Sequence, residues 1–61
     1  MELLKKIDTI FEEVKIETKN LENATSKEEE IESLKEILDA LMRGARHVQE
    51  KLDLYNERRY R

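Results

Sequence analysis

The sequence predicts an all-α protein with a single domain over residues 1–61: a helical hairpin that dimerises into an antiparallel, coiled-coil-like four-helix bundle. The chain contains no proline and only one glycine, so little in it would end strands or form long loops. Charged residues make up 44% of the chain and aromatic residues 5%, which is typical of long helices and coiled coils. The apolar residues also recur at alternating spacings of three and four, as they do on one face of a helix.

The longest unbroken pattern lies in the second half of the chain. Its apolar residues occupy positions a and d of consecutive heptads, which we call the seam. A helix of this kind is stabilised mainly by its packed face, so it requires other helices beside it. The seam positions of this half are Ile31, Leu34, Leu38, Leu41, Ala45, Val48, Leu52 and Tyr55.

Residues 2–22 are predicted to form a shorter first helix. Leu3 and Ile10 widen its apolar stripe at heptad position g. Glu2 stands four residues before Lys6, which is the favourable order for an ion pair on a helix. The large seam residues of this half are Leu4, Ile7, Phe11, Val14 and Leu21.

A turn is predicted between these helices, where four successive residues lack a large apolar side chain and the heptad register slips by one residue. Asn23 is expected to end the first helix in the left-handed conformation. Ser26 is then the expected N-cap of the next helix, and Glu29 completes a capping box with it. Thr25 paired with Glu28 is the alternative cap.

The second helix is predicted to span residues 27–59. Gly44 is its one doubtful position, because glycine inside a helix costs about 1 kcal/mol relative to alanine. A break at Gly44 would give three helices. We favour one continuous helix, since the register passes through Gly44 without a slip and no N-cap residue follows it. Gly44 and Ala45 would then mark a place where another helix comes close.

Both apolar stripes are wider than a single partner helix requires. Folding the chain at the turn would place Ile10 near Leu38. It would also place Ile7 near Leu41. A second hairpin is expected to cover what remains and complete a four-helix bundle. Because the second helix is longer, residues after about Val48 are expected to extend beyond the first.

Charge is distributed unevenly along the chain. Residues 1–42 contain six lysines and twelve acidic residues, a net charge of −6, whereas residues 43–61 contain six basic and three acidic residues, a net charge of +3. An antiparallel pairing of the two long helices would bring opposite charges together and would place Leu52 of one copy opposite Ile31 of the other. A parallel pairing remains the alternative.

No residue pattern indicates catalysis or a bound cofactor. The chain has no cysteine, no glycine-rich phosphate loop, and no carboxylate at a seam position. His47 falls at heptad position c, where we expect an ordinary surface histidine, and with Glu50 it would supply at most two metal ligands. We therefore expect no enzyme, no cofactor, no metal and no small-molecule substrate.

The sequence also gives an expectation about location. Residues 1–8 lack the apolar segment of a signal peptide. No apolar run approaches the length that spans a membrane. We expect a cytoplasmic protein without membrane contacts.

The expected function is that of a small non-enzymatic regulator or adaptor, which acts through protein–protein contacts as a helical homodimer and has a further, unidentified protein partner. The alternative is RNA or DNA binding by the arginine-rich C-terminal end, because arginine and tyrosine contact phosphates and stack on bases. The net charge of −3 works against general affinity for nucleic acid. This candidate partner or nucleic-acid surface consists of Arg43, Arg46, Lys51, Arg58, Arg59, Tyr60 and Arg61.

Overall fold

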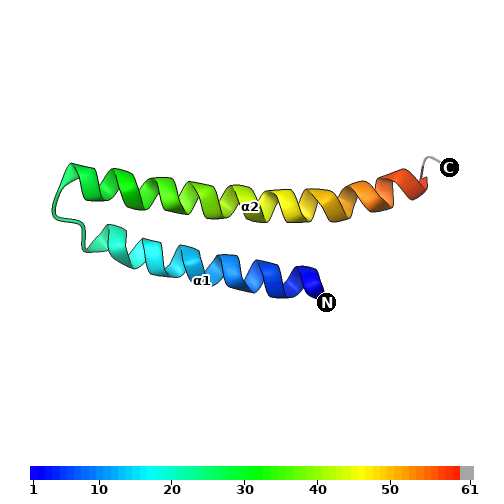
Figure 1. The fold of residues 1–61 in the computed structure, drawn as a ribbon, viewed down its shortest axis with the longest axis horizontal. Helices are drawn as coiled ribbons and strands as arrows, with labels where there is room; N and C mark the ends of the chain where they lie inside the picture. Colours follow the sequence, from blue (N-terminus) through cyan, green and yellow to red (C-terminus); the bar gives the residue numbers. More distant parts are fainter. Residues whose placement is uncertain (60–61) are drawn as a thin grey trace.

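The structure, a computed structural model, describes the backbone of residues 1–59 and the side chains of residues 1–56. Its two helices, α1 (Glu2–Glu22) and α2 (Lys27–Arg59), run side by side in opposite directions (Figure 1). The molecule measures 54 × 20 × 10 Å, so the hairpin is a flat layer about one helix thick. The predicted bounds of both helices and the continuity of α2 through Gly44 are confirmed.

The N-terminus of α2 is capped by the predicted residues. The backbone N–H of Glu29 donates a hydrogen bond to Ser26 Oγ at 3.2 Å. In return, the Glu29 carboxylate accepts a hydrogen bond from the backbone N–H of Thr25 at 3.1 Å, one residue before the usual position in a capping box. Serine, threonine and glutamate therefore act together at this cap.

The C-terminus of α1 differs from the prediction. Asn23 has φ −93° and ψ 2°, and no residue in the described part of the chain has a positive φ, so the expected left-handed ending is wrong. The backbone N–H of Asn23 donates to the carbonyl oxygen of Lys19 at 3.1 Å. The next N–H, of Ala24, donates to the carbonyl oxygen of Leu21 at 3.2 Å. These bonds satisfy the end of α1 without a left-handed residue.

The two helices do not pack through the seam of α2. Among the described side chains of α2, only Ser33 and Ala40 are buried, at 7% and 1% exposure, and Ile10 is the buried side chain of α1. The residues of α2 that α1 covers lie at heptad positions c and g, roughly 110° around the helix from the seam. They are Ser33, Ile37, Ala40, Gly44, His47 and Lys51.

The register of the hairpin also differs from the prediction. Ile10 lies over Gly44, where a Cβ atom would stand 3.5 Å from Ile10 Cδ1, so the expected placement of Ile10 beside Leu38 is wrong. The capped turn lets α2 begin beyond the end of α1, and buried packing on α2 starts only at Ser33. Gly44 does mark a close approach of another helix, as expected, and that helix is α1.

The same shift shortens the part of α2 that extends beyond α1. Met1 and Leu3 line a small surface hollow together with His47 and Leu54. The N-terminus of α1 therefore lies beside Leu54, and the expectation that α2 extends beyond α1 from about Val48 is wrong.

Replacing Gly44 with alanine is expected to stabilise the protein by about 1 kcal/mol, because alanine is the better helix former. The added Cβ would lie 3.5 and 3.6 Å from two side-chain carbons of Ile10, which is ordinary van der Waals contact. Urea unfolding followed by circular dichroism measures the change. A comparable loss of stability would show that the helices are too close at Gly44 to admit a methyl group.

Candidate protein-interaction surface

The seam of α2 faces solvent along its whole length. Leu38 is 59% exposed, Leu41 50% and Val48 40%, and no large apolar seam side chain of α2 is buried. These residues are exposed because α1 occupies the face of α2 that carries positions c and g. The hairpin alone therefore leaves the longest apolar stripe of the chain uncovered.

Helix α1 adds to the same apolar surface. Phe11, at 63% exposure, lines an open groove of about 470 Å³ together with Leu41, Ala45 and Val48 of α2, so it lies on the side of the hairpin that carries the seam. Leu4 is exposed one heptad before Phe11 and lies on the same side. We call this surface the seam face: Leu4, Phe11, Ile31, Leu34, Leu38, Leu41, Ala45, Val48, Leu52 and Tyr55.

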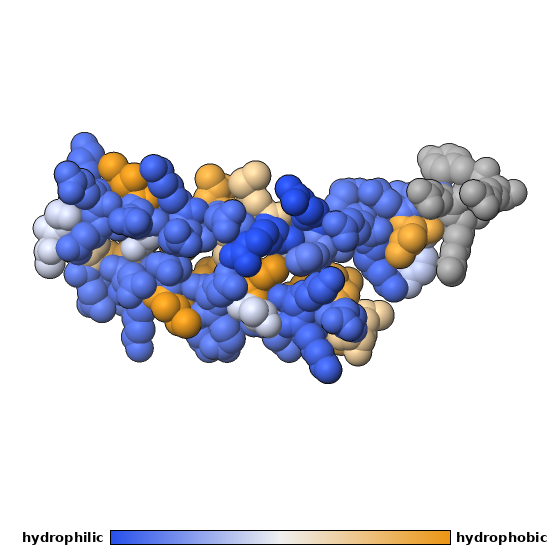
Figure 2. Space-filling view, in the orientation of Figure 1, coloured by the Kyte–Doolittle hydropathy of each residue, from blue (hydrophilic) through white to orange (hydrophobic). Residues whose placement is uncertain are grey.

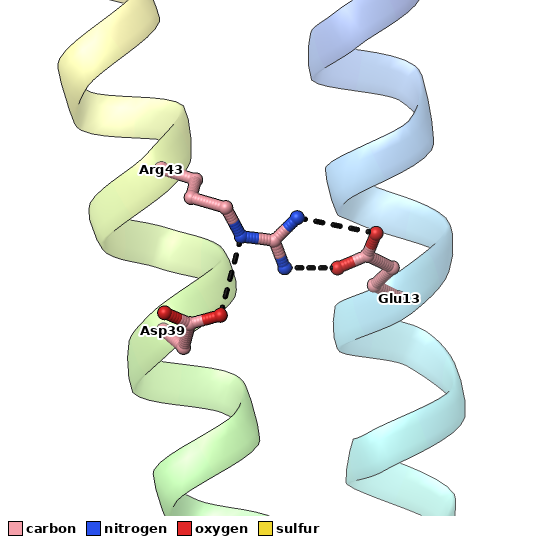
Figure 3. Close-up of polar contacts among 3 residues, drawn as sticks. All are labelled: Glu13, Asp39 and Arg43. Atoms are coloured by element: carbon pink, nitrogen blue, oxygen red, sulfur yellow. Dashed lines mark hydrogen bonds and ion pairs between the residues drawn. The ribbon is translucent and has the colours of Figure 1, made fainter.

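Polar side chains gather elsewhere. One broad face of the hairpin is mostly hydrophilic, with a few apolar residues among the charged ones (Figure 2). Arg43, which stands at heptad position f on the side of α2 away from the seam, reaches across to α1. Its guanidinium binds the carboxylate of Glu13 through two nitrogens and lies 3.2 Å from a carboxylate oxygen of Asp39 (Figure 3). Within the described residues, this is the one ion pair that joins the two helices.

This ion pair alters the acidity of its members. Hydrogen bonds from the Arg43 side chain lower the pKa of Glu13, and the positive charge of Arg43 acts in the same direction. The hydrogen bonds to Glu13 correspondingly raise the pKa of Arg43. A carboxylate whose pKa is lower in the folded than in the unfolded chain stabilises the fold above its unfolded pKa, and this contribution is lost as the pH falls through the folded pKa.

The Glu13→Gln variant is expected to lose less stability than the parent protein between about pH 5 and pH 3, because it lacks the carboxylate that must be protonated. Thermal unfolding at a series of pH values measures the difference. In an Arg43→Gln background, Glu13→Gln should have no such effect, since the partner is already gone. Equal pH dependence of the parent and Glu13→Gln would contradict the ion pair.

Three side chains of the predicted basic surface lie among the described ones, and each has different surroundings. Arg43 is engaged with Glu13 inside the hairpin. Arg46 is exposed, and Lys51 is half-buried with its Nζ 5.4 Å from the centre of the Tyr55 ring. The remaining side chains of this surface lie outside the described ones: Arg58, Arg59, Tyr60 and Arg61.

His47 is not the exposed histidine that the heptad position suggested. It is half-buried, because position c faces α1, and it lines a hollow with Leu3 and Lys6. Its Nδ1 atom is shielded from solvent and has no hydrogen-bond partner among the described residues. Glu50 lines the same hollow.

Two further findings concern the described part of the chain. It contains no group of three or more histidine, aspartate or glutamate side chains that are placed to hold a metal ion. Neither helix has a stretch long and apolar enough to cross a membrane.

Sequence reasoning missed Glu13 and the face of α2 that α1 covers. The sequence feature that marks this face is a row of small residues spaced by seven and then four positions. The row consists of Ser33, Ala40 and Gly44. Such a row allows two helices to approach closely. Once Gly44 is set against Ile10, the pairing of Arg43 with Glu13 follows from the antiparallel register.

Comparisons of this chain with protein-family models, with curated proteins and with solved structures find no significant match.

Proposed function

We propose that this protein is a small non-enzymatic regulator or adaptor that acts through protein–protein contacts as a homodimer, in which two hairpins stack by their seam faces into an antiparallel four-helix bundle. The observation that carries the proposal is the exposure of the seam face. A typical monomer exposes an apolar patch of only about 300–600 Å². The seam face has nine large side chains, each exposed by 40% or more.

The area of the seam face fits a stable interface. Half of a large apolar side chain presents roughly 80–100 Å², so the nine side chains offer roughly 700–900 Å² per copy. Each partner in a standard protein interface buries about 800 Å². Stacking two flat layers by their apolar sides gives the four-helix arrangement in which every helix contacts two neighbours.

A second copy is the partner that fits this surface. The seam face is long, flat and almost wholly apolar. A partner surface rich in charged side chains would fit it poorly, because those side chains would lose water without gaining polar partners. An identical seam face matches it in length and in apolar character, and a two-fold axis makes such a contact self-complementary.

Sedimentation equilibrium on the full chain tests the proposal. The expected result at micromolar concentration is a helical particle of twice the 7.4 kDa chain mass. A compact helical monomer under these conditions would overturn the proposed dimer. A chain that is largely unfolded by circular dichroism when alone would overturn it as well and would indicate a different subunit as the partner.

Retention of labelled RNA and DNA over a salt series tests the alternative function. The proposal predicts no binding whose strength falls steeply with salt, which is the behaviour of contacts to phosphates. The engagement of Arg43 within the hairpin supports this expectation, since it removes one cation from the basic surface. Steep salt-dependent retention would instead establish nucleic-acid binding.

A further inference from the structure

The exposed stripe on α2 is longer than anything α1 could cover. It runs from Ile31 to Tyr55, which is about 36 Å at the rise of an α-helix. Its exposure is similar at both ends, 44% at Ile31 and 53% at Tyr55. The part of the seam face on α1, from Leu4 to Phe11, is only about 10 Å long. Within a homodimer, only α2 of the other copy matches the stripe in length.

We propose that α2 of one copy packs antiparallel along α2 of the other, about a two-fold axis close to Met42. This inference rests on the homodimer proposed above. It specifies which helices meet, in which direction, and where the axis lies.

Charge sets the direction of the two helices. Residues 27–42 carry two lysines and six acidic residues, a net charge of −4, whereas residues 43–59, the rest of α2, carry five basic and three acidic residues, a net charge of +2. An antiparallel pair places the acidic half of each helix beside the basic half of the other. A parallel pair would place the two acidic halves (−4 each) side by side and the two basic halves (+2 each) side by side, and like charges across an interface oppose association.

The position of the axis follows from the register. Placing Ile31 opposite Leu52 of the other copy puts the midpoint between Leu41 and Met42. Met42 is 60% exposed and stands at position e, which borders the seam on the side away from α1. At this border Lys35 then lies near Gln49 of the other copy, so no like charges meet. The flexible thioethers of the two Met42 side chains pack against each other across the axis.

The same axis accounts for the exposure of Phe11. The Arg43–Glu13 ion pair and the contact of Gly44 with Ile10 place the middle of α1 beside the middle of α2. A two-fold axis that crosses α2 at Met42 therefore crosses α1 near Phe11. Phe11 is the most exposed large side chain of the seam face. Antiparallel pairing through the seam puts both α1 helices on one side of the α2 pair, so Phe11 meets the α1 helix of the other copy.

Spin labels at two positions on one border of the seam test the arrangement. Glu28 and Met42 both stand at position e, two heptads apart, and both are exposed. In the dimer of a Glu28→Cys variant, two labels should lie about 40 Å apart, because about 27 residues of helix separate them along the helix axis. In the Met42→Cys variant, the two labels should lie within about 20 Å, since each is next to the axis. Circular dichroism confirms that each labelled variant keeps its helices.

Short distances at both positions in a dimer would show a parallel pair and overturn the inference, while the proposed homodimer would stand. Thiol crosslinking distinguishes the proposed α2–α2 pairing from a dimer in which α2 packs against α1 of the other copy. A mixture of Ile31→Cys and Leu52→Cys proteins should crosslink to each other and neither to itself. A dimer without this crosslink would place α2 against α1 of the other copy and overturn the inference. A monomeric mass would instead overturn the proposed function itself.

Discussion

Replacing Leu38 with glutamate is expected to dissociate the proposed homodimer, with Kd rising by more than about a hundredfold. Leu38 is 59% exposed in the single hairpin, where a charge would be well solvated. In the proposed bundle the same site is covered by the other copy. The variant loses about 1.5–3 kcal/mol of apolar burial in each copy and also places a carboxylate at the interface. Sedimentation equilibrium over a range of concentrations measures Kd.

Ile16→Glu is the matched control for this experiment. Ile16 is also 59% exposed, but it stands at position f of α1, about 140° around the helix from Phe11. If the hairpin functions as a monomer, both variants should behave alike. A large loss of association in Leu38→Glu with little change in Ile16→Glu assigns the effect to the seam face. Equal effects of the two substitutions would contradict that assignment.

Replacing Ile10 with alanine is expected to destabilise the fold by about 2–5 kcal/mol, the usual cost of truncating a buried isoleucine. Ile10 is the best-buried large side chain among the described ones, at 6% exposure, and it packs against Gly44. Since Gly44 has no side chain, neighbouring atoms cannot easily fill the space that the truncation leaves. Urea unfolding at fixed protein concentration measures the change, because the stability of a dimer depends on concentration.

Ile10→Val provides the graded comparison, with an expected loss of about 0.5–1.5 kcal/mol. Truncating the exposed Ile16 to alanine should cost much less than the same change at Ile10. If the costs at Ile10 and Ile16 were equal, packing of α1 on Gly44 would not contribute to stability.

The sequence was sufficient to predict the helices because their signals are local. Ser26 and Glu29 lie within one helical turn of each other, so the cap depends on no distant residue. The unbroken heptad register correctly indicated that α2 passes through Gly44. The position at which α1 ends was predicted correctly, but the backbone conformation of Asn23 was not. The carbonyl groups of the last turn accept hydrogen bonds from the backbone N–H groups of Asn23 and Ala24, so no left-handed residue is required.

The choice of packing face was not predictable from the apolar pattern. That pattern gives weight to large side chains, and on this basis it predicts Leu38 as the neighbour of Ile10. Small residues at Ser33 and Ala40 instead allow α1 to lie close against positions c and g. The pairing of Glu13 with Arg43 was missed for the same reason, because it depends on the register that this packing sets.

The row formed by Ser33, Ala40 and Gly44 has a consequence at a distance. These residues determine how near the axis of α1 lies to that of α2, and hence how far Phe11 lies from Leu41 across the groove. A bulkier side chain at Ala40, which is buried against α1, would move α1 away from α2 within the layer and widen the groove between Phe11 and Leu41. In the proposed homodimer, the tightness of self-association therefore depends in part on residues that lie outside the seam face.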